Sequence, residues 1–245
     1  MAVAKPIQIV PLHDLAAAAP VSRPRLTYRG GPLLPAVQLF TFFWGFAWQQ
    51  DPLATLVQQV NQFFDFVVTS PLLDQLAEYS VPSTSIGYGT RTGAVILSTD
   101  PPATIDDTDV QQLIQQEISS DAAVPQPTPS SLYYVFLPPG VTITLDGAAS
   151  CSSFCGYHGD IHGGTFYAVM PYPDCSGCLG ALPVLDALTS TSSHELCEAI
   201  TDPVPGQGWY DDQNGEIGDI CAWKTRRLGA YTVQLEWSNG AGRCM

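Results

Sequence analysis

Charged residues are scarce in this chain, and basic residues are the scarcest of them. Only 13% of the 245 residues are charged, and 23 acidic residues outnumber 9 basic ones, which gives a formal net charge of −14. A surface of this charge repels phosphate groups, so we expect no nucleic-acid partner. The sequence also lacks a basic amphipathic segment, so we expect no attachment to a membrane surface.

Long apolar runs are missing as well. The most apolar stretch, residues 32–48, is interrupted by Pro35, Gln38 and Gly45 and is too short to span a bilayer. Residues 1–20 lack the continuous apolar core of a secretory signal peptide. We interpret residues 1–25 as a lead segment, either a prosegment that covers a cleft or a disordered tail. Residues 26–245 show no internal repeat and are long enough to bury one core, which predicts a single domain.

Apolar periodicity predicts alternating helices and strands. Helical spacing recurs over about 52–68, 71–79 and 106–119, and strands are expected at 37–44, 93–99, 131–137, 142–145 and 165–170. This alternation predicts an α/β or α+β protein in which helices cover a mixed sheet. We interpret residues 165–170 as an edge strand that borders a cleft, whether or not it pairs with an extended peptide.

The sequence His-Glu-Leu-Cys-Glu at residues 194–198 carries the strongest functional signal. It differs by one residue from the His-Glu-x-x-His signature of zinc peptidases. On a helix, His194 and Glu198 share one face, where they can hold a metal ion. Glu195 lies beside them, and its carboxylate can accept a proton from water as a general base. An ordinary amphipathic helix with one histidine is the alternative.

Two acidic residues downstream can complete this site. By analogy with thermolysin-like peptidases, Glu216, 18 positions after Glu198, is the third metal ligand, and Asp219 orients His194. The opposite assignment, with Asp219 on the metal, remains open. We expect Zn²⁺, although another divalent ion can compete because carboxylates make the site less positive. A Ca²⁺ loop or a plain acidic turn is the alternative for residues 208–221.

A glycine-rich stretch upstream contains two histidines. Residues 156–164 are predicted to form a loop that carries His158 and His162. Either histidine can reach the metal, polarise a substrate carbonyl or stabilise an oxyanion, and His158 is the catalytic candidate. The alternative is a loop histidine with a local structural hydrogen bond.

Seven cysteines indicate disulfide bonds. Their spacing groups six of them into the candidate pairs Cys151–Cys155, Cys175–Cys178 and Cys221–Cys244. Six cysteines allow many connectivities, and a structural zinc site at the first four is the alternative. Disulfides form in oxidising compartments, which favours an extracellular location. The seventh cysteine, Cys197, falls on the side of the helix opposite the metal face and is expected to be a buried apolar residue.

Motifs spread along the chain resemble one protein family. In order, they are Leu-Thr-Tyr-Arg-Gly-Gly-Pro-Leu at 26–33, Phe-Trp-Gly at 43–45, the cysteine motifs at 151–159 and 175–178, the pentapeptide at 194–198, Thr-Asp-Pro at 201–203, Gly-Trp-Tyr at 208–210, Glu-Ile-Gly-Asp-Ile-Cys at 216–221 and Trp-Ser-Asn at 237–239. From about residue 26 to the end, the chain resembles the phosphate-induced-protein-1 or exordium family. Since the plant members of this family are secreted, growth-associated proteins, the resemblance implies secretion.

Two functions fit these features. The first is a secreted zinc metallopeptidase that cleaves protein or peptide substrates with Glu195 as general base. The second is a non-catalytic binding or signalling protein with a structural metal site. For both we expect a monomer with a zincin-like mixed sheet, a central metal-binding helix and disulfide-stapled loops. An N-terminal lobe is expected to reach about residue 201, followed by a smaller C-terminal lobe over 202–245.

Overall fold

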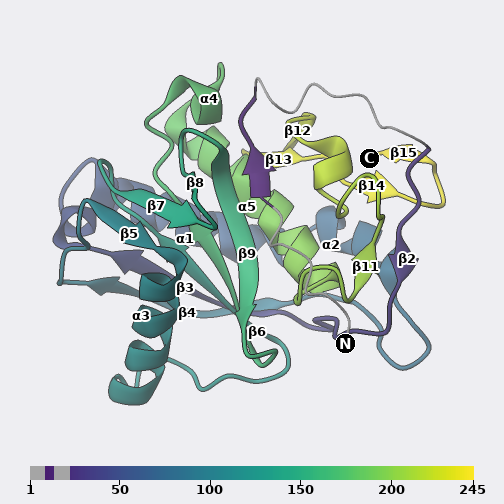
Figure 1. Cartoon of the computed structure of the whole chain (residues 1–245), viewed down its shortest axis with the longest axis horizontal. Coiled ribbons are helices and arrows are strands. Elements are labelled where there is room, and N and C mark those ends of the chain that lie inside the picture. Colours follow the sequence, from purple (N-terminus) through teal and green to yellow (C-terminus); the bar gives the residue numbers. More distant parts are fainter. Residues whose placement is uncertain (1–8, 14–22) are drawn as a thin grey trace.

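A six-stranded mixed sheet forms the middle of the molecule (Figure 1). The computed structural model describes residues 9–13 and 23–245. The strand order is β1-β9-β10-β6-β3-β4. These strands are β1 (Ile9–Pro11), β3 (Gln38–Trp44), β4 (Thr90–Leu97), β6 (Ser131–Phe136), β9 (Phe154–Ile161) and β10 (Thr165–Met170). Strands β4, β3, β6 and β10 run parallel, whereas β9 is antiparallel to β10, and β1 is antiparallel to β9.

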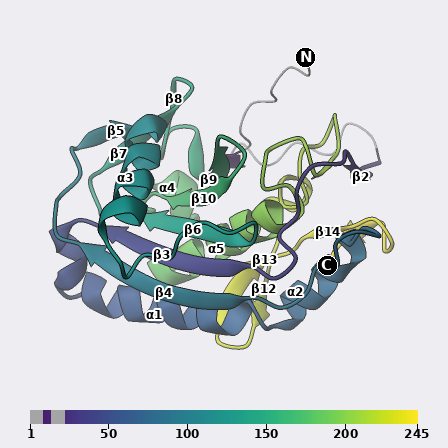
Figure 2. The same cartoon turned by 90° about the horizontal axis from the view of Figure 1, so that it is seen from below.

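Helices and a small second sheet cover the two faces of this sheet (Figure 2). One face packs against α1 (Leu53–Val67), α2 (Pro71–Leu76) and α5 (Val184–Thr201). The other packs against α3 (Asp107–Ser120) and a sheet made of β5 (Thr104–Asp106), β7 (Thr142–Leu145) and β8 (Ala148–Ala149). The short helices are η1 (Phe46–Gln49), η2 (Ala77–Tyr79), α4 (Ser176–Leu179) and η3 (Asp219–Cys221). The predicted mixed fold class is confirmed.

The sequence of the central strands explains the two packed faces. In β3, Leu39 and Phe43 belong to the core beneath α1 and α5, while Phe40 and Phe42 belong to the core beneath α3. Successive side chains of a strand point to opposite faces of the sheet. A strand with apolar residues on both of its faces therefore fills both cores, as parallel strands usually do.

Helix α5 lies close against the sheet and is buried from Ala187 to Thr201. It packs against β9 and β10. The approach to β9 requires a glycine, because a Cβ atom on Gly156 would lie 2.7 Å from Cγ2 of Thr191. On β6, the Tyr134 hydroxyl donates a hydrogen bond to the Ser192 carbonyl oxygen across 2.8 Å. The motif at 194–198 is thus held deep inside the molecule.

The C-terminal residues 202–245 pack against α5, and Asp202 and Glu216 also reach His158 on β9. They form β11 (Trp209–Tyr210), β12 (Thr225–Leu228), β13 (Tyr231–Gln234), β14 (Trp237–Ser238) and β15 (Arg243–Cys244), and β11 pairs with β2 (Thr27–Tyr28). Ile217, Val233 and Trp237 belong to the same hydrophobic core as α1 and α5. The same hydrophobic core therefore extends through both regions that were predicted to form separate lobes.

Two predictions about the sheet are wrong. Strand β10 is not an edge, since it lies between β9 and β6, and its backbone is hydrogen-bonded on both sides. The glycine-rich stretch is not a loop throughout, because residues 156–161 belong to β9 and the turn begins only at His162. The strand order depends on long-range packing, which local periodicity does not encode.

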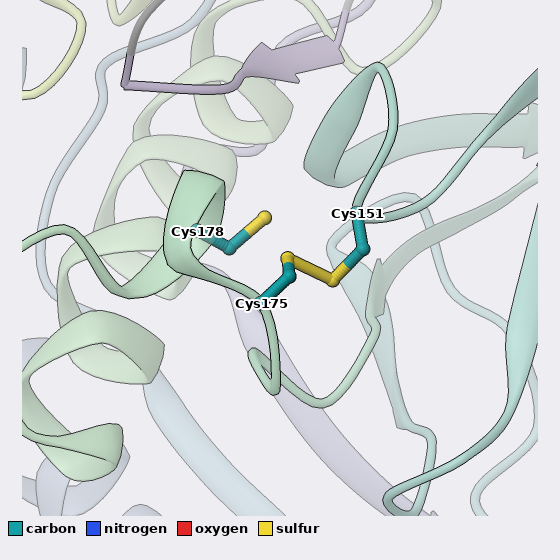
Figure 3. Close-up of side chains that lie close together, drawn as sticks. All are labelled: Cys151, Cys175 and Cys178. Carbon is teal, nitrogen blue, oxygen red and sulfur yellow. A yellow bond between two sulfur atoms is a disulfide. The ribbon is translucent and has the colours of Figure 1, made fainter.

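Three disulfides are present, and two of the predicted pairings are wrong. The bonds are Cys151–Cys175, Cys155–Cys178 and Cys221–Cys244, so only the last was paired as expected. Helix α4 packs beside β9, which brings the two cysteine motifs together, so that each bond joins one motif to the other. Figure 3 shows one of these bonds, Cys151–Cys175, with Cys178 beside it. Because all four of these sulfurs are in disulfides, they cannot form the alternative zinc site.

The remaining cysteine and the N-terminal segment complete the described fold. Cys197 is free and fully buried in the core, and burial raises the pKa of its thiol. Most of the predicted lead segment, residues 1–8 and 14–22, lies outside the described residues. Its described part, Ile9–Pro11, forms the outermost strand beside β9. Among the described residues, no helix has both the length and the apolar character that crossing a bilayer requires.

Candidate metal centre

The predicted site residues come together at one buried place between α5, β9 and the 216–219 loop. His194, Glu195 and Glu198 project from α5, and His158 projects from β9 toward them. The loop contributes Glu216 and Asp219. Asp219 has a side chain that is 13% exposed, and the other five residues are fully buried.

His194, Glu198 and Asp219 form the first group that can hold a cation. Nε2 of His194 lies 3.0 Å from Oε1 of Glu198 and 3.9 Å from Oδ1 of Asp219. Nε2 makes no hydrogen bond to either oxygen, because Oδ1 of Asp219 is too distant and Oε1 of Glu198, although close, lies off the N–H direction. Two ligands of one zinc ion lie about 3 to 3.5 Å apart without pointing at each other. The group thus fits a cation better than a hydrogen bond.

The ring of His194 is oriented by Gln234 of β13. The Gln234 side-chain nitrogen lies 2.8 Å from Nδ1 of His194 and donates to the Gly218 carbonyl oxygen at 3.0 Å. The Gln234 side-chain oxygen accepts from the Trp223 backbone N–H at 2.9 Å. With this amide orientation Nδ1 accepts a hydrogen bond, so the proton of the neutral ring lies on Nε2. A cation at Nε2 therefore requires the Gln234 side-chain amide to rotate, so that its oxygen instead of its nitrogen faces Nδ1.

His158, Glu195 and Glu198 form the second group. Nδ1 of His158 lies 3.0 Å from Oε2 of Glu195 and 3.6 Å from Oε2 of Glu198. On its other side, Nε2 of His158 lies 3.2 Å from the Asp202 backbone oxygen, which can only accept a hydrogen bond. The proton of the neutral ring is thus fixed on Nε2, and Nδ1 faces the carboxylates.

Glu216 lies apart from both groups. Its Oε1 is 3.6 Å from Nε2 of His158, and both of its carboxylate oxygens are buried without a hydrogen-bond partner. Asp219, in contrast, joins the first group, and its Oδ2 accepts from the Glu216 backbone N–H at 3.0 Å. Of the two assignments that the sequence left open, the geometry favours Asp219 as the ligand, because Asp219 lies with His194 and Glu198 in one group and Glu216 does not.

Burial and mutual repulsion shape the charges of the carboxylates. Burial, followed by the charge of Glu198, raises the pKa of Asp219 to about 7. The same two causes raise the pKa of Glu216 well above its usual value, and burial also raises that of Glu195. Glu198 differs, because the charge and proximity of His194 outweigh burial and lower its pKa. Glu198 is therefore the carboxylate that most favours its charged form here.

Burial and the neighbouring negative charges have opposite effects on the pKa values of the two histidines. Burial disfavours the charged ring of His158, but its hydrogen bond to Glu195 and the neighbouring negative charges raise its pKa to about 9. Burial also opposes charge on His194, and the charge of Glu198 again outweighs it and raises the pKa. The Gln234 amide nitrogen opposes a proton on Nδ1 of His194, so we assign the neutral ring there from the hydrogen-bond geometry.

The 216–219 loop closes directly over α5. The Asp219 backbone N–H donates to Oε1 of Glu198 across 3.1 Å. A Cβ atom on Gly218 would lie 2.8 Å from Nδ1 of His194 and 2.9 Å from Oε1 of Glu198. Gly218 has an ordinary φ of −80°, so the glycine is needed for close approach and not for backbone conformation.

Three polar residues of the site were not predicted from the sequence. Gln234 orients His194, as described above. Asp202 accepts hydrogen bonds from the backbone N–H groups of Gly206 and Gln207 and so fixes the turn after α5. Glu236 is fully buried, and neither of its side-chain oxygens has a hydrogen-bond partner. Only Asp202 lies in a noted motif, Thr-Asp-Pro at 201–203.

Together the residues fit a divalent cation, since each group offers one imidazole nitrogen and two carboxylate oxygens. The unpartnered buried atoms Nε2 of His194, Oε1 of Glu195 and Oε2 of Glu198 supply the polar surface that such an ion would satisfy. No known protein family, no curated protein and no solved structure matches this chain.

Proposed function

We propose that this protein is a secreted, metal-dependent hydrolase that cleaves peptide bonds. In this proposal His194, Glu198 and Asp219 hold one divalent ion, with Zn²⁺ as the expected ion. When bound, such an ion acidifies water and polarises a carbonyl group. The observation that carries the proposal is the convergence of His194, Glu198 and Asp219 within one small buried volume, with a carboxylate beside them.

Glu195 is the proposed general base. Its Oε2 is held by His158 at 3.0 Å, while its Oε1 is buried and has no hydrogen-bond partner. A carboxylate oriented through one oxygen can accept a proton from water on the other. The raised pKa of Glu195 supports this role, because a base is most effective when its pKa lies closer to the working pH.

His158 holds Glu195 in place. The hydrogen bond from Nε2 to the Asp202 carbonyl fixes the ring, and in the charged ring, which the raised pKa of His158 favours, Nδ1 donates to Oε2 of Glu195 and positions that carboxylate. This arrangement supports a positioning role for His158 over direct contact with substrate, since both ring nitrogens are engaged.

Secretion is supported by the disulfides. Three bonds join six of the seven cysteines, which is consistent with an oxidising compartment. The resemblance to the exordium family points to the same location. We propose membership of that family on the motifs quoted above.

One observation favours a second function, a non-catalytic binding protein with a structural ion. His158, His194, Glu195 and Glu198 are fully buried, and the Gly218 backbone lies directly on His194 and Glu198. A substrate therefore reaches the site only if the 216–219 loop moves. A structural ion needs no such movement.

Metal content and proteolysis of the purified chain separate the two functions. We expect a divalent ion to copurify and casein or gelatin to be cleaved, with Glu195→Gln reducing cleavage at least about 100-fold while the protein stays folded. Glu117→Gln, on α3 and remote from the site, is the matched control. A bound ion without cleavage over a broad pH range rejects the hydrolase and supports the binding protein.

A further inference from the structure

We infer that the chain holds a second divalent cation, bound by Nδ1 of His158, Oε2 of Glu195 and Oε2 of Glu198. The two ions would share Glu198 as a bridging carboxylate. The inference extends the proposed function and rests on it, because the first ion takes the other oxygen of Glu198.

The two candidate groups use opposite oxygens of Glu198. Oε1 lies 3.0 Å from Nε2 of His194, and Oε2 lies 3.6 Å from Nδ1 of His158. A bridging carboxylate places two ions about 3.5–4 Å apart, the separation typical of two-metal hydrolase sites. One glutamate from α5 can thus serve both groups.

The ring of His158 is oriented as a metal ligand requires, and a cation at Nδ1 would replace the proton that this atom donates to Glu195. Metal-bound histidines usually donate their other N–H to a carbonyl or carboxylate, which fixes the tautomer. Nε2 of His158 does this with the Asp202 carbonyl oxygen at 3.2 Å. Nδ1 of His158 then points at two carboxylates. At His194, in contrast, Nε2 becomes available to a cation only if the side-chain amide of Gln234 exchanges the positions of its nitrogen and oxygen.

An unsatisfied atom marks the second position. Oε2 of Glu198 is fully buried, faces Nδ1 of His158 and accepts no hydrogen bond. Leaving a buried carboxylate oxygen unpaired is costly, and a bound cation would satisfy it.

The balance of charge also favours a second ion. Within residues 9–13 and 23–245, the ion pairs of Glu195, Glu198, Glu216 and Asp219 involve only His158 and His194. When ionised, these four carboxylates carry four negative charges, of which one divalent cation would balance two, and buried charges are stable only when paired or coordinated.

Ion stoichiometry tests the inference on the full chain. Chelator-treated protein is titrated with Mn²⁺ by calorimetry, and electron paramagnetic resonance of the loaded protein shows whether the ions are magnetically coupled. We expect two ions per wild-type chain and a coupled spectrum. His158→Gln and His194→Gln should each bind one ion, and His162→Gln, which alters the histidine in the turn after β9, should still bind two.

The outcomes distinguish this inference from the proposed function. If the wild type binds one ion that is lost with His194→Gln and kept with His158→Gln, the second site is rejected and the first stands. One ion lost only with His158→Gln supports the new site and rejects the ligands proposed for the first. No bound ion rejects both. If His158→Gln does not fold, the wild-type spectrum decides, because an isolated Mn²⁺ signal at saturation overturns the inference.

Discussion

The side-chain nitrogen of Gln234 lies 2.8 Å from Nδ1 of His194 and thereby decides which nitrogen of that ring carries the proton. Most metal-bound histidines have an acceptor at this position, and here the chain has a donor. The amide is held from two further sides, by the Trp223 N–H and the Gly218 carbonyl oxygen. The affinity of His194 for a cation therefore depends on Gln234.

Replacing Gln234 with glutamate should strengthen cation binding at His194. A carboxylate accepts a proton from Nδ1, which leaves the lone pair of Nε2 for the ion, and such partners typically change metal affinity by about 10- to 100-fold. Because the substitution adds a buried negative charge beside the Gly218 carbonyl, the metal-free variant should melt at a lower temperature than the wild type.

Calorimetric titration with Zn²⁺ measures this affinity, and Gln234→Met is the neutral control of similar size. An affinity of Gln234→Glu equal to that of the wild type would show that the amide does not control His194.

Substituting Gly218 with alanine should disrupt the site by steric overlap alone. The new methyl group would lie less than 3.0 Å from atoms of His194 and Glu198, so the loop must shift. Forced shifts of this kind typically cost about 1–3 kcal/mol. We expect a lower free energy of unfolding and weaker ion binding. Gly164→Ala is the control, because its Cβ would have no neighbour within 4 Å; equal effects of both variants would contradict the proposed close packing.

Glu236 should make the protein less stable as the pH rises. Burial, with the charges of Glu198 and Asp219, raises the pKa of Glu236 well above its ordinary value of 4.5. A carboxyl group whose pKa is higher in the folded chain contributes stability below about pH 4.5, and this contribution is lost at higher pH.

Glu236→Gln should therefore raise the melting temperature at pH 8 and change it little at pH 4. Thermal unfolding at both values, in the presence of a chelator, measures the difference. A stabilisation of the same size at both pH values would show that ionisation of Glu236 is not involved.

Peptide mapping without reduction should reveal the crossed disulfides. Aromatic residues between the two cysteine motifs, among them Tyr157 and Tyr172, allow chymotrypsin to separate them. With Cys151–Cys175 and Cys155–Cys178, peptides from the two motifs remain joined until a reductant is added. Separate peptides before reduction would instead indicate local pairing. Each bond should stabilise the fold by about 3 kcal/mol.

Local patterns predicted the helix and the residues that lie on it. His194 and Glu198 are four positions apart, and helical periodicity alone places them on one face. Helix α5 contains the motif, as this spacing predicted, and buries it.

The partners of that helix could not be predicted in the same way. His158 is 37 positions from Glu195, and Gln234 is 40 positions from His194. Their meeting depends on the order of strands in the sheet and on the path of the C-terminal residues, which no local period encodes. The glycines around His158 suggested a loop, although Gly156 is needed because β9 and α5 pack so closely.

Strand β1 has a consequence for any peptide that approaches from the side of His158. Ile9 and Val10 pair with Tyr157 and Gly156, so the hydrogen-bonding groups on that border of β9 are already in use. Another peptide can pair with β9 at this position only by displacing the protein's own residues 9–11. An incoming peptide strand must therefore compete with β1 for pairing with β9, and β1 has the advantage of a high effective concentration because it belongs to the same chain.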